Sequence, residues 1–381
     1  MSMHVTPSDV LRRAQAVGNY YGFSSLAALA ASKKGQGTRA PYPDSINLEK
    51  LDPEAREVAT VLKSIRDAGL APSALTPLFV WHSNAAPGRP APKNIVVQFH
   101  ALGVEHAIAD AVLIRAVRSF MGDLTKAEPH LKLNSMGDKE TRSRFARELT
   151  GFFRKNGAIL PPDCVACSRT DVFEATEKLI ACKDGTCEIP SPTDHLSEAS
   201  RKHFEGVLEY LEATDTPYEL VPRILSRGSA WSETCFEVTV DDKLSAWGSR
   251  YSELSKPFFK GNFSSVGAVV RITLDDRAEI PAMKEKHNPR FVFVHIGDEA
   301  KRESMKIVDT LRHARIPLTQ SIGIESLTEQ MRFVDLINPP YVLIMGRKEA
   351  LERSVILRER ANHTETFIPL DSLVDRLRAV A

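Results

Sequence analysis

The sequence lacks the features that mark membrane, secreted and strongly charged proteins. No run of about 18 apolar residues occurs in the 381-residue chain, so it offers no membrane-spanning helix. The start of the chain lacks the apolar run of a signal peptide. Charge of one sign is not in excess, because 50 Lys and Arg residues meet 49 Asp and Glu residues. This balance excludes a nucleic-acid binder that relies on a bulk basic tail, but it leaves room for local basic patches.

Cysteine is also scarce, and its number is odd. The chain has five cysteines, which predicts reduced thiols, a cytoplasmic location and no membrane partner. At roughly 150 residues per domain, the length predicts two or three domains. Domains of that size bury enough apolar surface to fold without a disulfide or metal staple.

Hydrophobic periodicity predicts a mixed α+β body over residues 1–275. Thr6-Pro7-Ser8-Asp9 has the hydroxyl, proline and acid of a helix start. The four-cysteine segment 161–193 shows no pattern and is expected to be irregular. Further helices are expected over 53–68, 104–121, 139–156 and 195–213, and strands over 75–80, 95–99, 131–134, 219–225, 235–240 and 265–274.

The pattern changes after a polar stretch, residues 276–289, which is expected to be a linker. Beyond it, apolar strands at 291–296, 341–345 and 354–357 alternate with amphipathic helices, and a helix closes the chain at 372–380. This alternation predicts a separate α/β domain over 290–381, built around a largely parallel sheet.

Several stretches resemble the histidyl-tRNA synthetase family. They are LSEASRKHFEGVLEYLEATDTPYELVPRILSRG (196–228), LNSMGD (133–138) and QFHALGVE (98–105). In the C-terminal region, FVFVHIGDEA, SLTEQMRFVD and YVLIMGRKEA resemble the anticodon-binding domain that histidyl, glycyl, threonyl and prolyl synthetases share. The resemblance implies an α+β class II synthetase-like antiparallel sheet core with a helical insertion near 121–195, followed by an α/β anticodon-binding domain.

That family activates histidine with ATP and Mg²⁺, which requires cations held in a rigid cradle around the phosphates. The resemblance places the first of these cations in a Phe-Arg-x-Glu pattern, and this chain has Phe79-Val80-Trp81-His82 instead. A second arginine of the family corresponds to Val97. Valine has neither charge nor hydrogen-bond donor, so these replacements predict weakened or lost amino-acid activation.

Other positions that the resemblance marks are retained. Arg227 and Arg271 are the catalytic candidates, while Glu54, Glu105 and Tyr251 are the substrate-binding candidates. Each also has a structural interpretation: Arg227 as a salt-bridge partner, Arg271 and Glu105 as residues at a strand end, Glu54 as a first-turn helix acid, and Tyr251 as a core or interface residue.

Four of the cysteines are clustered as Cys164-x2-Cys167-x14-Cys182-x4-Cys187. This spacing approximates that of a closed, tetrahedral structural Zn²⁺ site. The alternative is a set of reduced thiols that bind no metal, and both interpretations stay open. Cys235 lies in a β-type run and is expected in the core.

The C-terminal region also carries a local group of basic residues. They could contact tRNA phosphates, or they could form a solvated, salt-bridged surface. The group consists of Arg312, Arg315, Arg347, Lys348, Arg358 and Arg360.

Three functions follow from the resemblance. The first is a paralogue with weakened or lost amino-acid activation and a tRNA-binding, RNA-binding or regulatory role. The second is a working, divergent histidine–tRNA ligase that acts on tRNA-His. The third is a regulatory subunit of the type that activates ATP phosphoribosyltransferase, a group that usually lacks the C-terminal domain. The resemblance also implies a homodimer.

Overall fold

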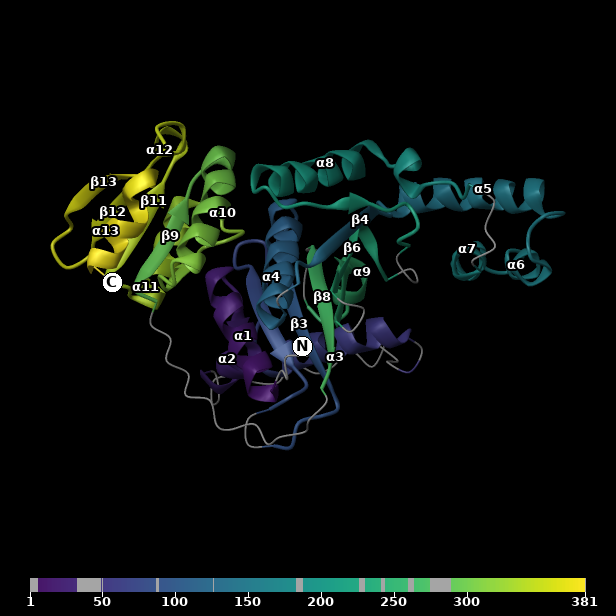
Figure 1. Cartoon of the computed structure of the whole chain (residues 1–381), viewed down its shortest axis with the longest axis horizontal. Coiled ribbons are helices and arrows are strands. Elements are labelled where there is room, and N and C mark those ends of the chain that lie inside the picture. Colours follow the sequence, from purple (N-terminus) through teal and green to yellow (C-terminus); the bar gives the residue numbers. More distant parts are fainter. Residues whose placement is uncertain are drawn as a thin grey trace.

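The computed structural model contains a large sheet body and a C-terminal domain, which lie side by side (Figure 1). Among the helices it describes, none is both long and apolar enough to cross a membrane. The described residues are 6–32, 49, 51–86, 89–125, 127–182, 188–225, 230–240, 244–259, 264–274 and 289–380. The predicted linker therefore lies almost wholly outside them.

The body is built on an eight-stranded sheet. Neighbouring strands from β2 to β4 are antiparallel, while the short edge strands β1 and β5 are parallel to their neighbours. This order confirms the predicted antiparallel core. Across the sheet, the strands are β1 (Ser24–Ser25), β2 (Leu78–Ser83), β3 (Asn94–Leu102), β8 (Ser265–Thr273), β7 (Leu244–Arg250), β6 (Ser232–Val240), β4 (His130–Ser135) and β5 (Glu219–Leu220).

Helices cover both faces of this sheet, because side chains alternate between the faces along each strand. On the rear face, Phe99 and Val270 pack in one apolar cluster with α1 (Pro7–Tyr20), α4 (Ile108–Leu124) and α8 (Glu198–Ala213). On the front face, Val80 and Val269 pack with α3 (Pro53–Asp67) and α9 (Ser252–Ser255). The short helix α2 (Leu26–Ser32) joins the front cluster through Leu26.

Capping residues set the helix starts that the sequence predicts. The Thr6 hydroxyl accepts a hydrogen bond from the Asp9 amide (3.2 Å), and the Asp52 carboxylate accepts one from the Ala55 amide (2.7 Å). These bonds satisfy backbone donors that a helix start otherwise leaves unpaired. The helix predicted over 139–156 is found as α5 (Lys139–Asn156), and Asp138 caps it in the same way.

The insertion carries more helix than the sequence predicts. The segment expected to be irregular contains α6 (Pro162–Cys167), α7 (Val172–Ala181) and a 3-10 turn (Pro192–His195). The Asp171 carboxylate caps α7 by accepting from the amides of Phe173 and Glu174. Both helices are too short for periodicity to reveal. Together with α5, they lie on the side of the body away from the C-terminal domain (Figure 1).

The C-terminal domain has a five-stranded sheet that is parallel in only part of its width. Strands β10 (Leu318–Gln320), β9 (Phe291–His295) and β11 (Tyr341–Met345) are parallel, whereas β12 (Ser354–Glu359) and β13 (Glu365–Pro369) add antiparallel pairs. The sequence patterns did not predict β10 or β13. The helices are α10 (Asp298–His313), α11 (Leu327–Ile337), α12 (Arg347–Leu351) and α13 (Leu373–Val380).

A charged cluster holds α10 against the body. Arg115 of α4, whose side chain is only 3% exposed, forms an ion pair with Asp309 of α10. The Tyr21 hydroxyl donates a hydrogen bond to the same carboxylate. Nearby, Arg312 forms an ion pair with Asp123 (2.9 Å). Apolar residues of both parts belong to one continuous cluster, so the two sheets share a core.

We expect Asp309→Asn to weaken this junction, because it leaves the Arg115 guanidinium buried without a counter-charge. Removing one partner of a buried ion pair costs about 3–5 kcal/mol, and the partial exposure of Asp309 places the loss at the lower end. Urea denaturation of the full chain measures this loss. Asp371→Asn is the matched control, because Asp371 is 93% exposed and pairs with Arg353 at 3.8 Å. Equal stability of both variants would contradict the prediction.

Candidate functional site

A cavity of about 570 Å³ opens on the front face of the body. Its floor comes from the sheet, since Lys132, Glu237, Trp247 and Val269 are successive register partners across β4, β6, β7 and β8. One wall is α7, which contributes residues 177, 180 and 181, and another is the segment 221–225. The start of α3 also lines the cavity. This volume is typical of a small-molecule site.

The cavity is mixed in charge rather than basic. Arg271, at the end of the floor, donates a hydrogen bond to Glu57 of α3 (2.8 Å). Trp231 and Trp247 add aromatic surface. Their rings pack edge to face, with centroids 4.6 Å apart. Such a lining suits a small ligand that carries both charges and an apolar part. The charged lining residues are Glu54, Glu177 and Glu237 on the acidic side and Lys132, Arg223 and Arg271 on the basic side.

Of the four predicted catalytic and substrate-binding residues that the structure describes, it brings two together. Arg271 and Glu54 line the cavity. Glu105 is exposed in the loop between β3 and α4, and Tyr251 is fully buried outside the cavity lining. Arg227 lies outside the described residues, so its relation to the cavity stays a prediction.

The position assigned to the first phosphate-binding arginine is filled with apolar packing. The Val80 side chain is fully buried and belongs to one cluster with Leu62 of α3, Val269 and Tyr251. Its strand partner His100 lies between Val80 and Gly267 in the register. A side chain at Gly267 would collide with His100, because a Cβ there would lie 2.4 Å from Nδ1. This part of the front face is therefore filled with side chains and leaves no space for a ligand.

His100 is the polar centre of that closed region. Its Nδ1 is hydrogen-bonded to the Tyr251 hydroxyl (2.7 Å), and its Nε2 is hydrogen-bonded to Gln98 Oε1 (3.1 Å). Burial, with a smaller contribution from the nearby His82, lowers the pKa of His100 to about 3. The ring is therefore neutral at physiological pH and acts as a buried hydrogen-bonding group.

We expect His100 to make the fold acid-sensitive. Below about pH 6.5 the unfolded chain protonates this histidine while the folded chain does not. Each unit by which the pH falls therefore lowers the free energy of unfolding by about 1.4 kcal/mol. The effect ends near the folded-state pKa, about 3. Urea denaturation between pH 7 and 5 should show a shallower pH dependence for His100→Gln than for the natural chain. His363→Gln, at an exposed position, is the control and should leave the slope unchanged.

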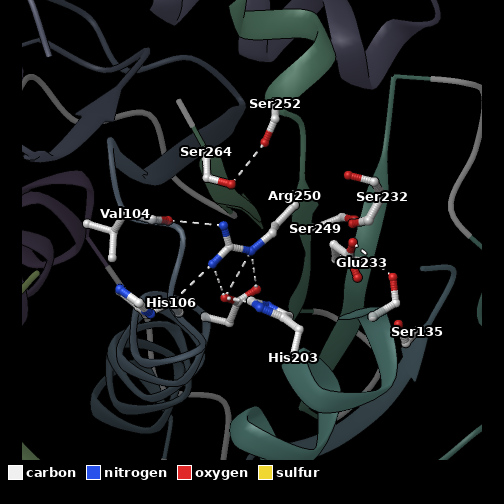
Figure 2. Close-up of polar contacts among 12 residues, drawn as sticks. Val104, His106, Ser135, His203, Ser232, Glu233, Ser249, Arg250, Ser252 and Ser264 are labelled. Carbon is white, nitrogen blue, oxygen red and sulfur yellow. Dashed lines mark hydrogen bonds and ion pairs between the residues drawn. The ribbon is translucent and has the colours of Figure 1, made fainter. Parts of the chain in front are cut away.

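A second polar network, which the sequence reasoning missed, lies on the rear face (Figure 2). Arg250, at the end of β7, is 2% exposed. Its Nε donates to both carboxylate oxygens of Asp110 (3.1 Å each). Its terminal nitrogens donate to the carbonyls of Val104 (3.0 Å) and His106 (3.1 Å). His203 of α8 also approaches Asp110 at 3.2 Å.

Burial alone would raise the pKa of Asp110, but Arg250 and His203 outweigh it and hold the pKa at about 2. Beside them, Glu233 has a left-handed backbone (φ 55°) where β6 and β7 slip in register. Its carboxylate accepts a hydrogen bond from Ser200 of α8 (3.1 Å), and burial raises its pKa. The network joins α4, α8 and two strands. The sequence signal for this network was Asp110, an acid inside the apolar run of α4.

Arg250→Lys is expected to destabilise the chain by about 3 kcal/mol, because an ammonium cannot reproduce the planar set of donors and leaves buried acceptors unpaired. Thermal or urea unfolding measures the loss. The control is Arg201→Lys, at a 58% exposed side chain that pairs with Glu198 within α8. If both variants unfold like the natural chain, the network does not support the fold in this way.

The predicted RNA-contacting residues mostly have protein partners. Arg312 lies at the domain junction. Arg358 pairs with Glu365 (2.7 Å), and Arg360 pairs with Asp335 (2.8 Å). Arg315 is exposed, and within the described part of the chain its guanidinium has no hydrogen-bond or ion-pair partner. The other two pairs are looser: Arg347 with Glu299 (3.4 Å) and Lys348 with Glu352 (3.9 Å).

The clustered cysteines lie at α6 and α7. Cys164 is buried, Cys167 is half-buried, Cys182 is exposed, and all three are free thiols. Cys187 falls outside the described residues. Where the structure describes the chain, no group of three or more His, Cys, Asp or Glu side chains is arranged to hold a metal ion. Cys235 is buried in β6, as expected.

Comparisons with known proteins cover both parts of the chain. A family model described as an anticodon binding domain matches residues 290–380. The histidine–tRNA ligase of Desulfatibacillum aliphaticivorans is 26% identical over 355 residues, which cover 89% of this chain and 83% of that protein. The histidine–tRNA ligase of Natranaerobius thermophilus is 25% identical over 303 residues, which cover 74% of this chain and 71% of that protein. The solved apo histidyl-tRNA synthetase of S. aureus aligns over 99% of this chain and 98% of that chain, with 19% identity and a TM-score of 0.48.

Proposed function

Because the chain belongs to the histidyl-tRNA synthetase family, we propose that it binds tRNA, or a similar RNA, and that its histidine activation is weakened or lost. The observation that carries the second part is the burial of Val80. Its side chain is 0% exposed and lies among apolar groups, at the position where the family resemblance calls for a phosphate-binding arginine. A valine there offers ATP neither charge nor hydrogen bond.

The surroundings of Val80 support the same proposal. His100 and Tyr251 satisfy each other within the closed part of the front face, so neither presents its polar atoms to a ligand. The open cavity lies beside this region and carries equal numbers of acidic and basic residues. A triphosphate would gain no net attraction from such a lining. Losing one preorganised cation costs roughly 10²–10³-fold in rate.

RNA binding rests on the C-terminal domain. The family model that matches residues 290–380 describes a domain that binds anticodons. Arg315, Arg347 and Lys348 present exposed positive charge on this domain. The presence of this domain also disfavours the regulatory-subunit hypothesis, in which the C-terminal domain is usually absent.

A histidine-dependent ATP–pyrophosphate exchange assay on the purified full chain tests the proposal. We expect no exchange above background, because the phosphate-binding cation is absent, together with measurable tRNA binding in a filter-binding assay at low salt. An active histidine–tRNA ligase assayed in parallel controls for the reagents. Exchange at rates typical of that control would overturn the loss of activation, and an absence of tRNA binding would overturn the RNA-binding part.

One observation favours the alternative of a working, divergent ligase. Arg271 and Glu54 line a cavity of about 570 Å³ on the front face, so a guanidinium and a carboxylate border the same cavity. In that case Arg271 would contact the phosphates, and ATP would bring Mg²⁺ to supply the missing charge. Efficient exchange in the same assay would select this alternative.

A further inference from the structure

One aromatic side chain of the C-terminal domain lies on the surface. Phe367, in the middle of β13, is 60% exposed, and it is the only exposed Phe, Trp or Tyr among the residues that the structure describes. The next residue, Ile368, points to the opposite face of the sheet. Ile368 is buried in one cluster with Leu373 and Leu377 of α13. The Phe367 ring therefore lies on the face of the sheet that α13 does not cover.

Phe367 continues a row of apolar side chains across the sheet. It is the register partner of Ile356 on β12, and Ile356 is the partner of Ile344 on β11. Side chains of directly paired residues lie on the same face. Ile344 packs in the cluster that α11 covers, Ile356 is half-buried, and Phe367 is exposed. The cover that α11 gives to this face therefore decreases from β11 to β13, and the row ends in an open ring.

A pair of opposite charges borders the ring. In the next row on the same face, Arg358 Nε donates a hydrogen bond to Glu365 Oε1 (2.7 Å), and the two side chains are 35% and 39% exposed. Strand β13 is the outer edge of its sheet, on the side away from the body (Figure 1). We call the surface made by Ile356, Arg358, Glu365 and Phe367 the Phe367 platform. It combines a flat apolar centre with a polar border.

We propose that the Phe367 platform receives an unpaired base of the RNA that the C-terminal domain binds, with the base stacked on the Phe367 ring. This inference rests on the proposed RNA binding and specifies one contact within it. Each nucleobase has a flat apolar face and a polar edge. The face matches the ring, and the edge matches the donors and acceptors of Arg358 and Glu365. The residues matched by the anticodon-binding family model include the whole platform.

The size of the platform favours a base over a second copy of this chain. Burying one aromatic side chain removes about 150–250 Å² from solvent. A stable protein interface buries about 800 Å² on each partner, and beside Phe367 the row offers only the half-buried Ile356. A stacked base needs only the face of one ring.

The neighbouring charges also suit RNA. Arg358 and Arg360 follow each other at alternate positions of β12, and each forms a salt bridge with a carboxylate that is at least 39% exposed. Salt bridges of this kind stabilise a protein little, so an RNA phosphate can replace the carboxylate at small cost. The backbone of a stacked nucleotide would therefore find cations next to the ring.

The test measures tRNA binding by the full chain in a filter-binding assay at several salt concentrations. We expect Phe367→Ala to weaken binding roughly 5- to 150-fold, which is the loss caused by removing one stacking contact. The slope of log affinity against log salt concentration should stay the same, because no phosphate contact is removed. Phe367→Tyr keeps the ring and should bind like the natural chain.

Leu336→Ala is the matched control and should leave tRNA binding unchanged. Leu336 is an apolar residue of α11 that is 82% exposed. It lies two residues beyond the buried Val334, which is more than half a turn of helix, so it points away from the sheet and the platform.

Equal tRNA binding by the natural chain and Phe367→Ala would overturn this inference and leave the proposed RNA binding intact. A failure of the natural chain to bind tRNA would overturn both. A loss of binding in Phe367→Tyr as large as in Phe367→Ala would show that the ring is not a stacking surface. A lower solution mass for Phe367→Ala than for the natural chain, measured by analytical ultracentrifugation, would assign the platform to a second copy of the chain instead.

Discussion

The buried ion pair between Arg250 and Asp110 is the interaction on which the arrangement of the chain depends. It fixes the start of α4 to the end of β7, in the interior, where an unpaired charge would be very costly. The same helix carries Arg115, which holds the C-terminal domain through Asp309. One helix thus connects the eight-stranded sheet to the C-terminal domain. Buried charges in the first turn of α4 (Asp110) and at its middle (Arg115) therefore link the two parts of the chain.

On the front face, Val80 belongs to a region whose side chains pack closely with one another. Val80 packs under α3, neutral His100 pairs with Tyr251, and Gly267 leaves the space that the His100 ring occupies. Each of these groups fits the others. An arginine at position 80 would place a charge inside an apolar cluster, which costs several kcal/mol unless a partner is buried with it.

Sequence patterns were most informative where local signals and burial agree. The helix over 139–156 was predicted at its observed bounds, because Asp138 caps it and its apolar residues are periodic. Strand β7 was missed because its sequence, LSAWGSR, alternates poorly, and pairing with β6 and β8 holds it in place. The candidate site, like β7, depends on pairing between distant strands. Lys132 and Glu237 meet in the cavity floor only through the register of strands about a hundred residues apart, which no local pattern encodes.

The ion pairs of the C-terminal domain separate its basic residues by their availability to RNA. An exposed salt bridge is worth about 0–1 kcal/mol, so an RNA phosphate can replace the carboxylate at little cost. Arg347 and Lys348 fall in this class, with side chains 75% and 73% exposed. Arg312 does not, because its guanidinium is largely buried against Asp123 and supports the domain junction. Three residues that looked equivalent as basic positions in the sequence therefore have different roles: Arg347 and Lys348 can exchange partners, while Arg312 holds the domain junction together.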